Sequence, residues 1–162
     1  LFKQSYQKNK INYFRVSDFS HNLSLNKNKI KLGKGIKIKN GKDLTIVCAG
    51  SFLDDAIEAY EILKKKKIEA EIIYLHTLKP IDQKMIQKSA NKTKKILILD
   101  SFNLKGGLTS ICMNFLKNIN NLKIENISIE RFIHDYGSYK NLKNKAGFNN
   151  TNILSKVKRL FV

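Results

Sequence analysis

The stretch Asp-Leu-Thr-Ile-Val-Cys-Ala-Gly-Ser, residues 43–51, decides the fold. Within it, residues 44–48 form a short apolar run rich in β-branched side chains, which is typical of a strand buried on both faces. Gly50 then allows a sharp turn, because glycine reaches backbone angles that are closed to other residues. Ser51 is expected to cap the following helix by accepting a hydrogen bond from its first free N–H groups.

The segments that follow complete a βαβ unit. From Leu53 to Leu63 apolar residues recur at three- and four-residue spacing, which predicts a helix with one apolar face. Lys64–Lys67 suit the negative end of that helix's dipole. A second apolar run, residues 70–75, begins almost at once. Strand, helix and strand with short joints predict a parallel sheet with a right-handed crossover.

Further strands are expected on both sides of this unit. Residues 96–99 predict a third buried strand, and the alternation in residues 124–129 predicts a fourth that lies nearer an edge. Residues 35–39 alternate Ile and Lys, and the turn-forming pair Asn40-Gly41 predicts a hairpin from them into the strand at Leu44. The expected fold is α/β, a three-layer αβα domain whose five-stranded sheet is mainly parallel with one antiparallel strand.

Four helices are expected after the βαβ unit, three of them with apolar residues on one side. Proline suits a first helical turn, and glycine suits a helix end. Pro80 is expected in the first turn of one helix, with Asp82 near its positive end, and residues 108–115 carry the apolar stripe of another. Tyr139 to Lys145 is expected to form a short helix ended by Gly147, and Thr151 or Asn152 is expected to cap the last helix.

Residues 1–34 are expected to lie outside the domain proper, which is residues 35–162. Residues 1–10 follow a helical pattern, and residues 11–16 have a strand pattern. Residues 17–34 are polar and rich in Asn and Lys, which predicts a linker. Because the chain begins with Leu1 and inside a helical pattern, we expect it to be a piece of a larger polypeptide.

The charge of the chain raises the possibility of nucleic-acid binding. There are 31 Lys and Arg against 13 Asp and Glu, giving a formal net charge of +18. However, the basic residues are spread through every segment, and nearly all are lysine rather than the arginine that nucleic-acid sites favour. We expect a solvated surface and no specific nucleic-acid site. No apolar run approaches the roughly 20 residues that cross a bilayer, so a cytoplasmic, membrane-free protein is expected.

Cysteine and histidine give no metal-binding pattern. Cys48 and Cys112 are far apart in the sequence, and each falls on a predicted apolar face, so both are expected to be small buried residues in a reducing compartment. His21, His76 and His134 lie in three separate segments. No metal site is therefore expected.

Three motifs carry a family resemblance. They are Gly-Lys-Asp-Leu-Thr-Ile-Val-Cys-Ala-Gly-Ser at residues 41–51, Leu-His-Thr-Leu-Lys-Pro-Ile-Asp at residues 75–82, and Gly106-Gly107-Leu108. In this order and spacing they resemble the C-terminal domain of the transketolase family, and the match extends from Tyr13 to the C-terminus. That family uses thiamine diphosphate and includes transketolase, deoxyxylulose-phosphate synthase and the β subunits of 2-oxo-acid dehydrogenases.

The resemblance implies a division of labour. In the family an N-terminal domain holds the cofactor's diphosphate and Mg²⁺, while a middle domain binds the pyrimidine ring and carries the catalytic glutamate. Residues 1–16 correspond to the tail of that pyrimidine-binding domain. This chain is then expected to have no catalytic or cofactor-binding residue of its own. Its implied partners are those two domains, in the same or a separate chain, within a homodimer or heterotetramer whose interface it enlarges.

The resemblance and the local patterns single out five candidate residues for an interface or an anion site: Asp100, Gly106, Gly107, His76 and His134. Backbone N–H groups at the helix start after Gly107 can hold an anion, although a tight turn also explains the glycines. Where sugar-phosphate-using members have Ser-Arg, this chain has Ser17-Asp18, so the substrate class stays open. The alternatives are a stand-alone module for an anionic ligand and, less favoured, a nucleic-acid binder.

Overall fold

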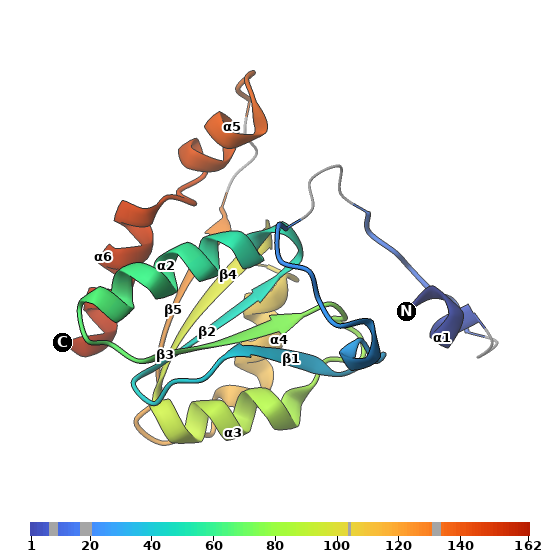
Figure 1. Cartoon of the computed structure of the whole chain (residues 1–162), viewed down its shortest axis with the longest axis horizontal. Helices are drawn as coiled ribbons and strands as arrows, with labels where there is room; N and C mark the ends of the chain where they lie inside the picture. The colour runs from blue at the N-terminus through green and yellow to red at the C-terminus, as the bar shows by residue number, and fades with distance from the viewer. Residues whose placement is uncertain (7–9, 17–20, 104, 131–133) are drawn as a thin grey trace.

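The computed structural model covers the whole chain and describes residues 1–6, 10–16, 21–103, 105–130 and 134–162 (Figure 1). From β2 (Leu44–Ala49) to β5 (Lys123–Ile129), strands and helices alternate along the chain, and an extended N-terminal segment precedes them. None of the helices in the described ranges has both the length and the apolar character needed to cross a membrane.

The sheet has five strands in the order β1-β3-β2-β4-β5. The parallel pairs are β2 with β3, β2 with β4, and β4 with β5, while β1 runs antiparallel to β3. This confirms the predicted α/β sheet with one antiparallel strand. The strands are β1 (Gly35–Lys39), β2 (Leu44–Ala49), β3 (Ala70–Leu75), β4 (Lys95–Asn103) and β5 (Lys123–Ile129).

Helices cover both faces of the sheet (Figure 1). One core cluster packs the side chains of α2 and α6 against one face, and a second packs those of α3 and α4 against the other. The helices are α1 (Phe2–Tyr6), α2 (Leu53–Lys65), α3 (Gln83–Thr93), α4 (Leu108–Leu116), α5 (Tyr139–Lys145) and α6 (Asn150–Phe161), with short 3₁₀ turns η1 (Lys27–Lys29) and η2 (Gly50–Phe52).

The three strands predicted to be central are adjacent and buried. Leu44–Cys48 of β2 and Ile96–Leu99 of β4 have 0% exposure at every residue, and β3 is buried throughout. The fourth predicted strand, β5, lies at an edge, as expected. Unbroken apolar runs therefore located the middle of the sheet correctly, because only strands covered on both faces carry them.

The predicted hairpin at Asn40-Gly41 is wrong, because β1 pairs with β3 and not with β2. The segment between β1 and β2 instead crosses the backbone just before β3. There the backbone N–H groups of Lys42 and Asp43 both donate to the carbonyl of Glu69. A Cβ on Gly41 would lie 2.3 Å from the backbone of Ala70. Glycine is thus required here for a close crossing of two backbones rather than for a tight turn.

Two predicted helix starts are also corrected. Pro80 lies outside α3, whose N-cap is Asp82, with its carboxylate accepting from the N–H of Met85 at 3.2 Å. The last helix is capped by Asn149, whose side chain accepts from the N–H of Asn152 at 2.9 Å. In both cases the cap is a residue two or three positions from the predicted one. Its side-chain oxygen accepts a hydrogen bond from a free N–H group of the first helical turn. The short helix α5 has the predicted bounds.

The N-terminal segment differs from its predicted strand. Residues 1–6 include the helix α1, but residues 11–16 form no strand, since a strand needs a hydrogen-bonded neighbour and none is beside them among the described residues. Instead the side chain of Gln4 makes the anchor. It donates to the carbonyl of Ile30 at 2.9 Å and accepts from the N–H of Leu32 at 2.7 Å.

Both cysteines are free and fully buried, as predicted. Burial raises the pKa of the Cys112 thiol to about 12, with a smaller contribution from the nearby Asp100, and burial likewise raises the pKa of Cys48. The thiols therefore stay neutral and pack as small apolar groups.

Candidate functional site

The sheet topology marks one place where a site is expected. The strand that follows β2 in the chain, β3, lies on one side of β2, and the next strand, β4, lies on the other side of β2. Crevices of doubly wound sheets form at the carboxyl ends of two such diverging strands. We call the side of the molecule where the parallel strands end the carboxyl edge. It carries η2 after β2, the loop after β4 and the residues after β5.

The start of α4 brings three of the predicted site residues together on this edge. Asp100 is 2% exposed, and its carboxylate accepts from the backbone N–H of Thr109 at 2.8 Å. Gly107 is the N-cap of α4, and Gly106 has a φ of +93°, with its N–H donating to the Ser110 hydroxyl at 3.0 Å. A carboxylate of the chain itself thus occupies part of the position that a bound anion would take.

His76 lies elsewhere on the carboxyl edge, after β3. Its Nε2 donates to the carbonyl of Lys31 at 2.9 Å. Close by, the Thr77 hydroxyl accepts from the N–H of Gly33 at 3.0 Å, and the Asp82 carboxylate accepts from that of Gly35 at 3.2 Å. These bonds hold the segment that leads into β1 against the end of β3.

His134 lies in the residues after β5 and is exposed. The next residue, Asp135, forms an ion pair with Lys145 at 3.2 Å. Since β2 and β4 separate β3 from β5, the two histidines lie toward opposite ends of the carboxyl edge, and the structure does not bring them together. Ser17 and Asp18, which bear on the substrate class, lie outside the described residues.

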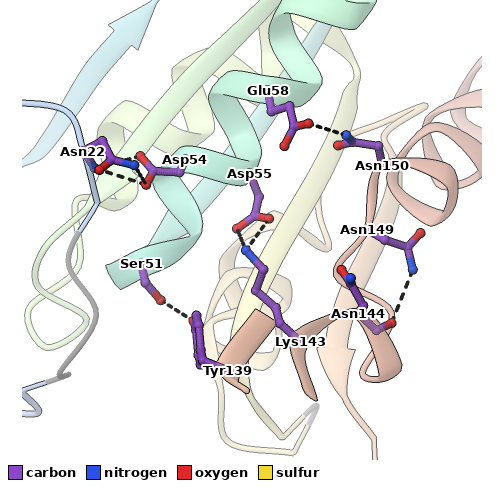
Figure 2. A network of polar contacts seen from close by, with 10 residues as sticks. All are labelled: Asn22, Ser51, Asp54, Asp55, Glu58, Tyr139, Lys143, Asn144, Asn149 and Asn150. Carbon is purple, nitrogen blue, oxygen red and sulfur yellow. Dashed lines mark hydrogen bonds and ion pairs between the residues drawn. The ribbon is translucent and has the colours of Figure 1, made fainter. Parts of the chain in front are cut away.

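The N-terminal half of α2 gathers contacts that the sequence did not predict (Figure 2). The Ser51 hydroxyl lies 2.8 Å from the hydroxyl of Tyr139 on α5. Ser51 therefore does not cap α2, which begins after η2 without a side-chain cap. Asp54 accepts three hydrogen bonds from Asn22, and Glu58 accepts one from Asn150 at 2.6 Å. The η2 turn and α2 thus tie the segment at Asn22, α5 and α6 together.

An ion pair between Asp55 and Lys143 is the most buried member of this network. The two carboxylate oxygens of Asp55 lie 2.8 and 3.0 Å from Lys143 Nζ, and Asp55 is 7% exposed. Burial raises the pKa of Asp55, and the hydrogen bonds and charge of Lys143 offset that effect only partly. Because α5 has no buried residue, these polar contacts are what hold it on α2.

Replacing Lys143 by Met is expected to lower the free energy of unfolding by about 2 kcal/mol, because it removes charged hydrogen bonds from a buried carboxylate. Detachment of α5 lets water reach Asp55 and limits the loss. Asp55→Asn should cost less, because an amide avoids the burial of a charge, and it should rescue part of the loss when combined with Lys143→Met. Denaturant unfolding of the three variants tests this; equal losses in all three would contradict it.

A second polar cluster lies between the sheet and α3, centred on Glu71 of β3. The Glu71 side chain is 0% exposed and contacts Lys37 at 2.7 Å, Lys92 at 2.6 Å and the hydroxyl of Ser89. Ser89 in turn lies 2.6 Å from the Thr45 hydroxyl. A signal was present in the sequence, since Glu71 is the one charge inside the apolar run of residues 70–75 and a buried charge needs a partner.

These clusters are structural in character. Each ionised group in them is satisfied by a neighbour from another element, an arrangement that fixes the elements in place. In the described part of the chain, no three His, Cys, Asp or Glu side chains are grouped so that they could hold a metal ion. The geometry defines a three-layer α/β domain with a polar carboxyl edge.

The chain belongs to the transketolase C-terminal domain family, whose model matches residues 33–153. It is 38% identical over 78 residues to the putative transketolase C-terminal section of Methanocaldococcus jannaschii, covering 48% of this chain and 24% of that protein. It is 29% identical over 126 residues to the 1-deoxy-D-xylulose-5-phosphate synthase of Halothermothrix orenii, covering 76% of this chain and 20% of that protein.

A solved structure has the same fold. The inactive β4 tetramer of a split-gene transketolase superposes with a TM-score of 0.74 at 25% identity, covering 81% of this chain and 43% of that one. The chain therefore spans less than half the length of each of these proteins. Its family and fold are clear from these matches, and they confirm the resemblance in the three sequence motifs.

Proposed function

We propose that this chain is the C-terminal part of a thiamine-diphosphate-dependent transketolase-like enzyme and acts there without catalytic residues of its own. Its role is to support the domains that hold thiamine diphosphate and Mg²⁺ and to enlarge the interface of a homodimer or heterotetramer. The match of the family model to residues 33–153 carries the proposal. One relative, from Methanocaldococcus, is named as a transketolase C-terminal section. This name supports the view that the remaining domains are partners of this chain, in the same polypeptide or in a separate one.

Exposed apolar side chains near the N-terminus support a partner domain at that end. Phe2, Tyr13 and Val16 are 62%, 86% and 88% exposed. The ring of Phe2 also lies 5.6 Å from that of Tyr6 and 5.5 Å from that of Phe14, so the aromatic side chains form a group. A contiguous apolar surface of this kind marks an interaction site more often than a free surface. We assign it to the preceding pyrimidine-binding domain.

The carboxyl edge supports an interface role over an anion site. Asp100, Gly106 and Gly107 shape the start of α4, and the Asp100 carboxylate already accepts one of the N–H groups that an anion would use. In this proposal the loops around these residues, His76 and His134 meet neighbouring domains, and the cofactor lies in those domains rather than here.

The test mixes the chain with a transketolase section that supplies the N-terminal and pyrimidine-binding domains. Calorimetry should detect binding of thiamine diphosphate with Mg²⁺ to the complex and none to this chain alone. Replacing Phe2 and Phe14 by Ser should weaken the complex, whereas Val162→Ser, a change to an exposed apolar residue at the other terminus, should not. Micromolar cofactor binding by the chain alone would contradict the placement of the cofactor site in the other domains. Failure to form any complex would refute the support role.

A further inference from the structure

The outer side of β5 is an uncovered sheet edge. β5 pairs with β4 on its inner side, and no strand in the described ranges pairs with its outer side. It is seven residues long and contains no proline. An edge of this length presents a row of free backbone N–H and C=O groups that can pair with another strand.

The opposite edge, β1, is built differently. It is five residues long, it carries Lys37 and Lys39, and its pairing with β3 shifts register between those two residues. Short length, lysines and an irregular register are the features by which proteins prevent edge-to-edge pairing. In contrast to β1, β5 has a regular stretch, since residues 123–127 pair with β4 without a shift in register.

Hollows flank β5 on both faces of the sheet, so neither neighbouring helix closes over the edge. On the α4 side the hollow contains Met113, which is 46% exposed, together with Ile124. On the α6 side the hollow lies between the end of β5 and the first turn of α6. An exposed methionine beside an isoleucine provides an adaptable apolar contact next to the free strand edge.

The charges on β5 select a partner. Lys123 and Glu125 lie on one face of the strand, and Ile124 lies on the other, because side chains alternate along a strand. If a second copy pairs antiparallel about a two-fold axis at Ile124, each Lys123 faces the Glu125 of the other copy. A shift of the axis by one residue either way places like charges opposite one another, which is unfavourable.

We propose that β5 is a self-association surface, on which β5 of a second copy of this chain pairs antiparallel with the two-fold axis at Ile124. The two Ile124 side chains then meet on the axis, with Met113 of each copy beside them. On the opposite face Glu125, which already pairs with Lys156 at 2.9 Å, gains Lys123 of the other copy as a second cation. Such a two-fold contact buries the same surface on both copies and closes after two.

Net charge opposes this association at long range. Each copy carries +18, so two copies repel until salt screens them, with a screening length of about 10 Å at 0.1 M. The dimer should therefore strengthen as salt rises, opposite to the behaviour of binding to a polyanion. The proposal specifies a surface for the assembly role proposed above, but it concerns this chain alone, so either one can fail without the other.

Sedimentation equilibrium of the whole chain tests the surface through a charge exchange. Lys123→Glu and Glu125→Lys each place like charges across both symmetric pairs and should raise the dimer dissociation constant about tenfold. The double variant exchanges the charges and should return the constant to within about threefold of the original. Since it does not restore the Glu125–Lys156 pair, rescue cannot come from that contact.

Lys84→Glu, an exposed change on α3, is the matched control. Like Lys123→Glu it lowers the net charge by two, so a general charge effect would strengthen association in both. The proposal requires that, of these two variants, only Lys123→Glu weakens association. A chain that stays monomeric at every concentration and salt level would overturn the proposal. So would a dimer whose dissociation constant is the same in the original chain, both single β5 variants and the double variant, provided that circular dichroism confirms each fold.

Discussion

Val47→Asp is expected to leave the chain unfolded. Val47 is 0% exposed in β2, the strand between β3 and β4, and its side chain belongs to the core cluster under α3 and α4. Nothing in that cluster of apolar side chains can pair with a carboxylate, so the new group would be buried as a charge or take up a proton. Either outcome costs several kcal/mol, comparable to the whole stability of a domain, about 5–15 kcal/mol.

Circular dichroism and the amide region of an NMR spectrum measure the result. Val47→Ala is the control, since it removes volume without adding charge and should leave a folded protein that is destabilised by about 2 kcal/mol. A cooperative thermal transition in Val47→Asp near that of the control would contradict the placement of β2 at the centre of the sheet.

The second large effect is expected at Glu71, when Lys37 and Lys92 are both changed to Met. The carboxylate would keep its buried position and lose both cations. Breaking a buried pair in this way costs about 3–5 kcal/mol. The loss should fall near the lower figure, because the two lysine side chains are 38% and 42% exposed and partly screened by water. Glu71→Gln should cost less, since the released lysines can turn to solvent.

The pH dependence identifies the cause. Burial alone would raise the pKa of Glu71, but hydrogen bonds from Lys37, Lys92 and Ser89 outweigh it and hold the pKa below its ordinary value. In the original protein this stabilisation is therefore present above the pKa of an unfolded glutamate, about 4.3, and is lost as the pH falls through the lower folded value. In the double variant burial dominates, and protonation of Glu71 relieves the cost in acid.

Denaturant unfolding from neutral to acidic pH should accordingly show the widest gap between the two proteins near neutrality and a narrowing gap in acid. Lys84→Met with Lys88→Met removes two exposed lysines from α3 and should change stability by less than about 0.5 kcal/mol. A gap that stays constant with pH would mean that the lysines stabilise through their alkyl stems rather than through Glu71.

The proposed functions place different demands on the surface of the domain. A supporting domain must present rigid contacts to its neighbours, and the network from α2 to Asn22, Lys143 and Asn150 provides such rigidity on the side of the carboxyl edge (Figure 2). The β5 edge is a different surface, at the end of the strand order, and it adjoins the network only where α6 packs beside β5.

The sequence by itself determined the βαβ centre of the fold. The runs at residues 44–48, 70–75 and 96–99 and the stripe from Leu53 to Leu63 were predicted correctly, because burial on one face or two leaves a periodic apolar pattern in the chain. The three family motifs, which include the first of these strands and the loops after the second and third, identified the family. The candidate residues Asp100, Gly106 and Gly107 were also found this way, because a strand end before two glycines marks a loop at the carboxyl edge.

Tertiary structure alone decided which elements meet. Asn40-Gly41 has the composition of a hairpin turn, yet β1 pairs with β3, because pairing depends on which strand has a free side and not on the turn alone. Ser51 has the composition of a cap, yet its hydroxyl meets Tyr139, which is 88 residues away in the sequence. Asp55 with Lys143, and Glu71 with two lysines, are likewise contacts between distant segments. Local patterns record the burial of a residue, whereas the identity of its partner depends on the path of the whole chain.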